Sequence, residues 1–235
     1  MESPMDVKDI LAQLQKLGNP NHVKIYARHG VTGPCYGVPY GDLKPLVKKL
    51  GRDQQAALAL WSSGVHDARV LATMIADPEK MTRAQIEAWL ADSTNYGLVD
   101  AVSSVAARMP GALELARSWI QKNGEWPTTA GWNVMAMLCA QGHLSDRDAR
   151  PLLEKIESGI HDQPNRTRYA MNNVLIGIGG SIETMRPRAL AVAKSIGTVE
   201  VDHGETGCKT PDAAQYIAKM LAYKAAKTKG VRKPG

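Results

Sequence analysis

The pentapeptide Ser63-Gly64-Val65-His66-Asp67 recurs in closely similar form as Ser158-Gly159-Ile160-His161-Asp162. Each copy lies between two stretches whose apolar residues follow the three- and four-residue spacing of an amphipathic helix. A turn repeated between helices of similar length is typical of proteins built from stacked helix pairs. The repeat therefore favours an α-solenoid over a four-helix bundle. A solenoid curves into a concave face that suits an extended partner.

Helical periodicity extends over nearly the whole chain, and glycine and proline fall almost wholly at the joints. The pattern predicts helices over residues 7–17, 23–27, 43–50, 56–61, 68–75, 86–90, 96–108, 111–121, 128–140, 146–157, 165–178, 183–196 and 211–228. No segment alternates cleanly at a period of two, and residues 198–202 come nearest. We therefore expect an all-α protein: a curved α-solenoid of HEAT-like repeats over residues 1–210, then a terminal helix and basic tail over residues 211–235.

The composition is that of a globular chain. Of its 235 residues 44% are hydrophobic and 22% are charged, a balance that disordered proteins do not have. No run of 18 apolar residues is present, and the acidic start of the sequence does not have the form of a signal peptide. The three cysteines, Cys35, Cys139 and Cys208, are too scattered for a disulfide framework. We expect a cytoplasmic protein with no membrane partner.

The net charge of +6 favours an anionic partner, but the excess of basic residues is confined to one end of the chain. Residues 219–235 contain no acid and carry the whole excess in Lys219, Lys224, Lys227, Lys229, Arg232 and Lys233. We expect this segment to be frayed. Residues 1–218 contain equal numbers of basic and acidic residues. A nucleic-acid groove in this part of the chain therefore requires that the two signs of charge lie on different faces of the solenoid.

The most informative single stretch is residues 95–102, in which Tyr96 and Asp100 are four residues apart. On a helix this spacing places the aromatic ring and the carboxylate one turn apart on the same face. Leu98, Val102 and Val105 supply apolar contacts on another side. The spacing alone is more typical of an ordinary solvated helix face, because aromatic–carboxylate pairs at i, i+4 are common.

Two stretches carry a resemblance to a known family: residues 23–44, with Tyr26 and the run Tyr36-Gly37-Val38-Pro39, and residues 60–72, from Leu60-Trp61 to Leu71-Ala72. Both resemble the AlkD-like DNA alkylation repair proteins, and the similarity spans roughly residues 5 to 195 in matching order. The resemblance implies a HEAT-like α-solenoid with DNA against its concave face. It also implies excision of N3- or N7-alkylated purines.

The resemblance assigns roles residue by residue. Asp100 takes the position of the catalytic carboxylate, which stabilises the oxocarbenium-like sugar left when a cationic base departs. Tyr96 and Tyr26 are expected to offer aromatic faces to the lesion or the sugar-phosphate backbone. Apart from the resemblance, His66 and Arg69, beside Asp67, are expected to form a polar support under the site, although capping or a core hydrogen bond is the commoner role of a histidine at a turn between helices.

The chain departs from the family pattern at two places. Where the family has a Trp-x-Arg-Arg run, whose arginine supports the phosphate backbone, this chain has Trp126-Pro127-Thr128-Thr129. A threonine hydroxyl donates one hydrogen bond to a phosphate but brings no charge. A later family tryptophan falls near residues 173–176, where this chain has no aromatic. Trp126, Thr128 and Thr129 are retained here as expected DNA contacts.

Basic residues elsewhere are expected to divide between the groove and ordinary solvated surface, with Lys24 and Arg28 the expected phosphate contacts. The others are Lys44, Lys48, Lys49, Arg69, Arg166 and Arg168. His203 and Cys208 have ligand-type side chains, but a metal site needs three or four ligands. We expect no metal and no cofactor.

The resulting hypothesis is a monomeric DNA repair protein that binds double-stranded, alkylated DNA and associates with the nucleoid. Asp100 would be the electrostatic catalyst of an alkylpurine glycosylase. Two alternatives remain: a non-catalytic family member that recognises DNA structure by shape, favoured by the missing arginine and tryptophan, and a HEAT-type scaffold for protein partners.

Overall fold

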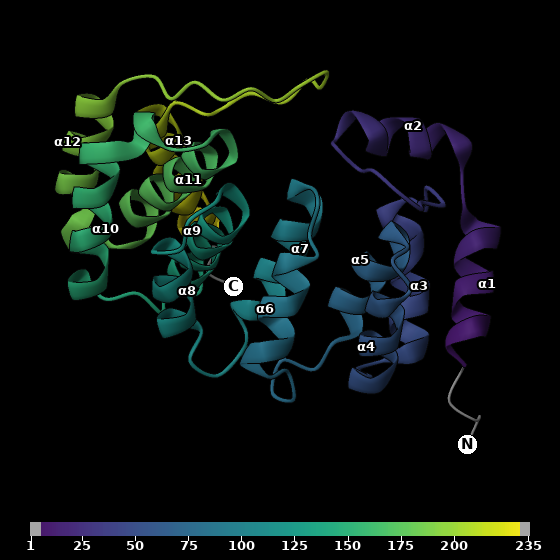
Figure 1. The fold of residues 1–235 in the computed structure, drawn as a ribbon. Coiled ribbons are helices and arrows are strands. Elements are labelled where there is room, and N and C mark those ends of the chain that lie inside the picture. Colours follow the sequence, from purple (N-terminus) through teal and green to yellow (C-terminus); the bar gives the residue numbers. More distant parts are fainter. Residues whose placement is uncertain (1–5, 231–235) are drawn as a thin grey trace.

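The computed structural model describes residues 6–230, and in that range the regular structure is entirely helical (Figure 1). The elements are α1 (Val7–Leu17), α2 (Pro20–Arg28), α3 (Tyr40–Leu50), α4 (Gln54–Ser62), α5 (His66–Ile75), α6 (Arg83–Ala91), α7 (Tyr96–Ala106), α8 (Ala112–Ile120), α9 (Glu125–Ala140), α10 (Asp146–Gly159), η1 (Ile160–Asp162), α11 (Asn165–Ser181), η2 (Glu183–Met185), α12 (Arg186–Ile196) and α13 (Ala213–Gly230). These bounds confirm the predicted all-α class. Residues 198–202, the nearest to a strand in the sequence pattern, lie in an extended loop.

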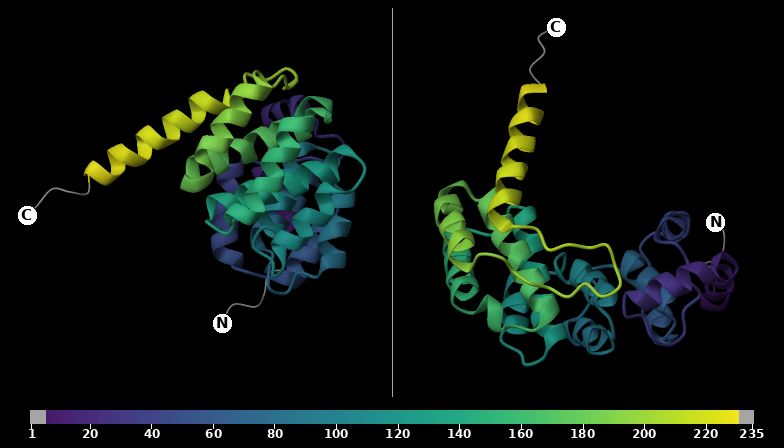
Figure 2. Two further views of the ribbon diagram at one scale, coloured as in Figure 1. Left: turned by 90° about the vertical axis from the view of Figure 1, so that its left-hand side faces the viewer. Right: turned by 90° about the horizontal axis from the view of Figure 1, so that it is seen from above.

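The helices stack as consecutive pairs, α4 with α5, α6 with α7, α8 with α9, α10 with α11 and α12 with α13. The second helix of each pair also packs on the second helix of the next, from α5 through α7, α9 and α11 to α13. We call α3, α5, α7, α9 and α11 the inner layer. This arrangement of pairs along a curved stack confirms the predicted solenoid of HEAT-like repeats (Figures 1 and 2).

The two pentapeptides occupy equivalent places in this stack. Ser63, Gly64 and Val65 join α4 to α5, whereas the second copy ends α10 and continues through η1 toward α11. Val65 and Ile160 are both buried, so each turn inserts one apolar residue beneath the helix pair that it joins. Gly64 has a φ of +73°, a left-handed conformation that glycine adopts without steric cost.

Tryptophans fix the spacing between the first pairs. The rings of Trp61 and Trp89 stack with their centroids 4.4 Å apart, and the Trp61 Nε1–H donates to Asp92 at 3.0 Å. Arg69 lies over the Trp61 ring and donates from Nη1 to the Asp92 main-chain oxygen at 3.1 Å. Arg69 therefore holds α4, α5 and the end of α6 together. It supports the scaffold and does not line the cavity described below.

The approach of α8 to α9 depends on Gly131. A Cβ atom at this position would lie 2.8 Å from the Ala116 carbonyl oxygen and 2.8 Å from the Ile120 backbone nitrogen. Both are main-chain atoms, so α9 would have to move away from α8 to accommodate a larger residue.

We expect Gly131→Ala to destabilise the fold by about 1–3 kcal/mol through overpacking. For a chain of this size each kcal/mol lowers Tm by about 2–4 °C. Gly41→Ala is the matched control, because a Cβ at Gly41 on helix α3 meets no atom within 4 Å. Thermal unfolding of the two variants gives the comparison. Equal Tm values would show that the α8–α9 contact tolerates the methyl group.

The helix predicted over residues 211–228 is observed as α13 (Ala213–Gly230), and it includes residues 219–230, which we expected to be frayed. α13 continues to Gly230, and at its start Ile217 and Met220 pack against Gly179 and Gly180 of α11. Its later turns extend away from the body of the protein (Figure 2). The basic excess is thus presented largely on a helix, although Arg232 and Lys233 lie outside the described residues. None of the described helices combines the length and apolarity needed to cross a membrane.

Candidate nucleic-acid interface

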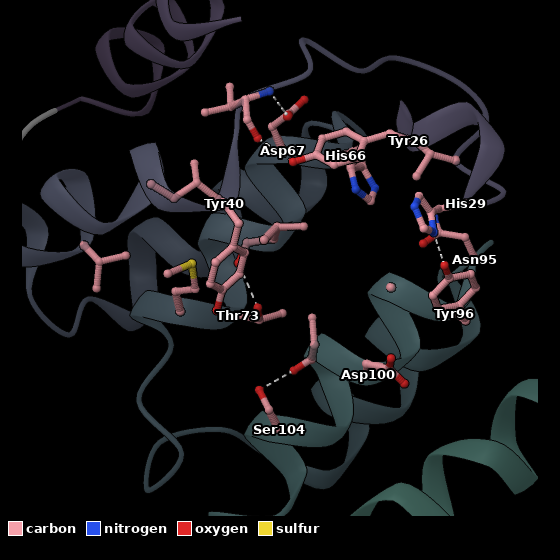
Figure 3. Close-up of a pocket in the computed structure, with 18 of the residues that line it drawn as sticks. Tyr26, His29, Tyr40, His66, Asp67, Thr73, Asn95, Tyr96, Asp100 and Ser104 are labelled. Atoms are coloured by element: carbon pink, nitrogen blue, oxygen red, sulfur yellow. Dashed lines mark hydrogen bonds between the residues drawn. The ribbon is translucent and has the colours of Figure 1, made fainter. Parts of the chain in front are cut away.

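Tyr96 and Asp100 lie on the face of α7 that is turned away from the core. Asn95 begins this helix, because its side-chain oxygen accepts a hydrogen bond from the Leu98 backbone nitrogen at 3.1 Å. Leu98 and Val102 are buried on the opposite side. Figure 3 shows the Tyr96 and Asp100 side chains directed into the space between helices, as their i, i+4 spacing predicts.

Asp100 is held by groups from two other inner helices. The Asn133 amide on α9 donates to the Asp100 Oδ1 at 2.7 Å, and the Arg166 guanidinium on α11 lies close enough to act on its charge. The carboxylate is exposed to solvent, yet it sits between inner helices whose bulk removes part of its hydration. This desolvation raises the pKa of Asp100 to about 6, against the lowering effects of Arg166 and then of the Asn133 hydrogen bond.

Arg166 is the centre of an aromatic cluster. Its guanidinium carbon lies 3.7 Å from the centroid of the Tyr96 ring and 5.3 Å from that of Tyr169. The Arg166 backbone nitrogen donates to a Glu125 carboxylate oxygen at 2.6 Å, which fixes the start of α11. Cation–π stacking immobilises the guanidinium while leaving its N–H groups available for a phosphate or carboxylate.

The extended loop over residues 197–212 is pinned to the same helix. Asn165 exchanges two hydrogen bonds with the Asp202 backbone, each 2.7 Å long, and Asn172 donates to the Pro211 carbonyl oxygen at 2.9 Å. The His203 ring packs edge-on against Tyr169, and its Nε2 shares a hydrogen bond with the Thr210 hydroxyl. His203 therefore belongs to the support of the aromatic cluster. The described residues contain no group of three potential metal ligands.

Tyr26 and His66 lie on the other side of α7. The Tyr26 hydroxyl donates to the Val38 carbonyl oxygen at 2.6 Å, and its ring centroid lies 5.5 Å from that of His66. The buried Asp67 carboxylate accepts from the Tyr36 and Val38 backbone nitrogens at 2.6 and 2.7 Å, which holds this connecting loop in place. His29 hydrogen-bonds to the Tyr96 hydroxyl and so links α2 to the start of α7.

A cavity of about 710 Å³ lies between Tyr26 and His66 and the face of α7 that carries Tyr96 and Asp100 (Figure 3). Helices α2, α3, α5 and α7 form its walls, and Asp100 and Tyr96 stand on one of them. The lining includes Tyr26, His29, Val31, Val38, Tyr40, Leu43, Val47, His66, Asp67, Val70, Thr73, Met74, Asn95, Tyr96, Gly97, Asp100, Ala101, Ser104 and Arg108. The inner layer thus presents an apolar hollow on one side of Asp100 and the Asn133–Arg166 pair on the other.

A family model described as DNA alkylation repair enzyme matches residues 10–217. The chain belongs to this family. It is 33% identical over 214 residues to an uncharacterized protein of Listeria innocua and, equally, to one of Listeria monocytogenes. Each alignment covers 88% of this chain and 93% of the relative.

One solved structure is similar over most of both molecules. It is described as belonging to "a new family of proteins related to the HEAT-like repeat DNA glycosylases with affinity for branched DNA structures". The match has a TM-score of 0.86 and 31% sequence identity, and it covers 94% of this chain and 95% of the other. The resemblance inferred from sequence is therefore confirmed at the level of family and fold.

The alkylation repair chain places the predicted site residues unevenly. Tyr26, Tyr96, His66 and Asp100 converge on the cavity, whereas Lys24 and Arg28 are exposed on α2. Arg69 supports the packing of helix pairs, as described above.

Thr128 and Thr129 differ from the expectation that they face DNA. Both are buried, at 8% and 3% exposure. The Thr128 hydroxyl donates to carbonyl oxygens of the preceding turn, and the Thr129 hydroxyl pairs with that of Thr167 at 3.0 Å. Trp126 is only partly exposed and packs against the core. The early turns of α9 thus direct Thr129 toward α11 and Thr128 back toward the segment that precedes α9, and we do not retain the two threonines as DNA contacts.

Asn133 was missed as a site residue, and Arg166 was predicted only as one of several basic residues that divide between the groove and solvated surface. Arg166 supplies a cation beside Asp100 from α11, at a position unrelated to the family's Trp-x-Arg-Arg run. Tyr169 likewise supplies an aromatic ring on the helix where the family tryptophan is absent. The residue types of Asn133, Arg166 and Tyr169 do not indicate that they lie near Asp100. Only the stacking of α7, α9 and α11 brings them together.

We expect Asn133→Ala to move the pH dependence of any Asp100-dependent reaction. A reaction that needs the carboxylate declines as pH falls through the pKa of about 6. Removing the amide hydrogen bond disfavours the charged form, so the pKa rises and the acid limb moves to higher pH. The measurement is the single-turnover rate between pH 5 and 8 (roughly the range over which such a group titrates).

Gln141→Ala, at an exposed amide beyond the end of the same helix, is the control and should leave the acid limb in place. If the acid limb does not move in Asn133→Ala, a group other than Asp100 governs the pH dependence of the rate.

Proposed function

We propose that the chain binds alkylated duplex DNA along its inner layer and hydrolyses the N-glycosidic bond of N3- or N7-alkylated purines. The observation that carries this proposal is Asp100, accessible in the inner layer and held by Asn133 with Arg166 beside it. Membership of the alkylation repair family supports the same chemistry.

The arrangement suits departure of a cationic base. The bond between the sugar C1′ and the purine nitrogen breaks, and its electron pair neutralises the positive charge of the alkylated base. Positive charge then develops on the sugar, where the Asp100 carboxylate stabilises it without reorganisation. A water oxygen adds to C1′ and loses its proton to the carboxylate or to bulk water. This chemistry needs no metal and no redox cofactor.

Arg166 and the tyrosines would position the DNA. The guanidinium stacked on Tyr96 can donate to a phosphate next to the lesion, which keeps the sugar close to Asp100. Because Arg166 also lowers the pKa of Asp100, the same side chain favours the charged form needed for catalysis. Lys24 and Arg28 on α2 are proposed as further phosphate contacts.

A second candidate function rests on the solved structure of similar fold, whose description names affinity for branched DNA. In this alternative the inner layer recognises the shape of a DNA junction and Asp100 has no catalytic role. The absence of the family's Trp-x-Arg-Arg run is the sequence feature that favours it.

Duplex DNA containing N7-methylguanine tests the two candidates together. Release of free N7-methylguanine at a rate above that of spontaneous depurination supports the glycosylase. No release, with tighter binding to a four-way junction than to a duplex of the same length, supports the structure-specific binder. Absence of DNA binding at low salt would contradict both and leave a protein-interaction scaffold.

A further inference from the structure

Helix α13 is packed on the body of the protein only through its first turns. Ile217 is fully buried and lies so close to Gly179 of α11 that a Cβ atom there would clash with its side chain. The Lys224 Nζ donates to the Gly180 carbonyl oxygen at 2.7 Å, near the C-terminus of α11, where a positive charge is favourable. Beyond this anchor α13 continues to Gly230, away from the other helices (Figure 2). The anchored turns therefore fix the direction in which the rest of the helix projects.

One face of α13 alternates between tyrosine and lysine. Its members follow one another at intervals of three, four and four residues, the spacing of side chains on one helix face, and are Tyr216, Lys219, Tyr223 and Lys227. We call these four residues the Tyr–Lys stripe. All four are exposed, and Tyr223, at 69%, is the most exposed of the large hydrophobic side chains that the structure describes. The Lys219 Nζ lies over the Tyr216 ring, 6.0 Å from its centroid.

Neither the candidate site at Asp100 nor the family match accounts for the stripe. The match to the alkylation repair family ends at residue 217, so most of the stripe lies beyond it. The cavity beside Asp100 is lined by other helices. Residues 219–235 contain six basic residues and no acid, so the partner that suits this end of the chain is anionic.

Tyrosine and lysine on one helix face suit a single nucleic-acid strand. Lysines contact its phosphates, and an exposed aromatic ring stacks on a base of any sequence, because every base has a π-face. Tyr216 and Tyr223 are about 10 Å apart along the helix axis, so each ring can meet a different base. In a duplex the base faces are covered by neighbouring pairs, and only the lysines would find a partner.

An anionic membrane surface fits this helix less well. A helix that lies in a membrane interface buries a continuous apolar face. On α13 the larger aliphatic side chains of the described residues pack against the core of the protein, and they are Ile217, Met220 and Leu221. Exposed positions on its other faces include Ala222 and Ala225, which supply little apolar surface.

We propose that the Tyr–Lys stripe of α13 binds a segment of single-stranded DNA. Lys219 and Lys227 contact the phosphates, and Tyr216 and Tyr223 stack on bases. DNA is the expected strand because the chain belongs to a DNA repair family. The site is separate from Asp100 and its binding does not require base excision.

Moving one tyrosine ring around the helix tests the proposal. Tyr223→Ala removes the ring from the stripe, and the double variant Tyr223→Ala/Ala225→Tyr restores it about half a turn away, at another exposed position. The double variant has the composition and net charge of the parent protein, so it is the matched control for a general effect of an exposed aromatic residue. Circular dichroism establishes that both variants are folded.

The first readout is the fluorescence anisotropy of a labelled oligo-dT, which contains no purine and is therefore no substrate for the proposed glycosylase. Tyr223→Ala should weaken its binding by roughly 10-fold, and the double variant should not recover the loss. Binding of a blunt-ended duplex should stay at the parent value in both. Parent-like binding of oligo-dT by either variant overturns the proposal, and so does an equal loss of duplex binding, which would indicate a contact to the backbone alone.

The second readout is the salt dependence of oligo-dT binding. Lys227→Gln should reduce the slope of log K against log salt by about 0.7, the value for one phosphate contact to a single strand. Lys194→Gln, at an exposed lysine on α12, removes the same charge outside the stripe and should leave the slope unchanged. Equal slopes in Lys227→Gln and the parent protein overturn the phosphate contact.

A photo-cross-link locates the strand directly. An oligo-dT with 5-iodouracil in place of one thymine should cross-link to the peptide that contains Tyr223, and the double variant should lose this product. Cross-links confined to peptides of other helices overturn the site on α13. Binding of the parent protein to anionic phospholipid vesicles that Tyr223→Ala loses, without binding of oligo-dT, would identify a membrane contact and overturn it as well. None of these outcomes depends on excision, so a failure of the proposed glycosylase leaves the test intact.

Discussion

We expect Asp100→Asn to abolish most of the proposed excision of N7-methylguanine while leaving DNA binding intact, and this is the largest effect that we predict. The substitution removes the negative charge at the position where positive charge develops on the sugar. Loss of one preorganised electrostatic group of this kind costs roughly 100- to 1000-fold in rate. Single-turnover release of the free base at pH 7.5, with protein in excess over DNA, measures the loss.

The variant is expected to fold because an asparagine side chain at this position keeps the geometry of the site. Its amide oxygen can still accept the hydrogen bond that Asn133 donates to Asp100 Oδ1 in the parent chain. Removing an acid from the inner layer should leave duplex affinity unchanged or raise it slightly, since phosphates repel carboxylates. A fall in excision that is matched by a fall in DNA affinity would indicate a binding role for Asp100 and would contradict catalysis.

Asp9→Asn is the matched control, because Asp9 is an exposed acid on α1 with no part in the site. It should leave both excision and binding at the parent values. If Asp100→Asn behaves like Asp9→Asn in a parent protein that does release the base, another residue carries the chemistry.

The α-solenoid could be predicted from the sequence because its helices and turns are specified by local patterns. The stripe beginning at Val7, the glycines at helix ends and the turn at Gly64 each specify structure within a few residues. The predicted helices accordingly match those observed to within a few residues, with α2, α3, α6 and α9 beginning about one turn earlier than expected. The helix predicted over residues 211–228 is α13 (Ala213–Gly230), but the packing of Ile217 on Gly179 could not be predicted, because it depends on contact between distant segments.

The site was predictable only where its residues share a helix. Tyr96 and Asp100 are one turn apart, so their common face follows from helix geometry. Asn133 and Arg166 reach Asp100 from α9 and α11, and no pattern within either segment distinguishes them from ordinary polar residues. Thr129 shows the opposite error: its place in a family motif suggested a DNA contact, but the rotation of α9 turns it toward Thr167.

Arg166→Gln should produce the second large effect, because this one side chain acts on the candidate site in two ways. It lowers the pKa of Asp100, and its guanidinium stacks 3.7 Å from the Tyr96 ring centroid. Without it we expect excision at neutral pH to fall by roughly 100-fold, as for loss of one electrostatic group in an active site. The pKa of Asp100 should rise above its value of about 6, so the acid limb of the rate profile moves to higher pH.

The pH profile separates the electrostatic role of Arg166 from DNA binding alone. If Arg166 only contacts a phosphate, its loss weakens binding and reduces the salt slope by about one, with no shift of the acid limb in single-turnover rates at saturating protein. Arg166→Lys keeps the charge but not the planar stacked group, so the acid limb should stay near the parent position while DNA affinity drops. Arg147→Gln, at an exposed arginine on α10, controls for a general loss of positive charge. An acid limb that stays fixed in Arg166→Gln would contradict the coupling of Arg166 to Asp100, and with it the view that an arginine from α11 supplies the cation missing from the family motif.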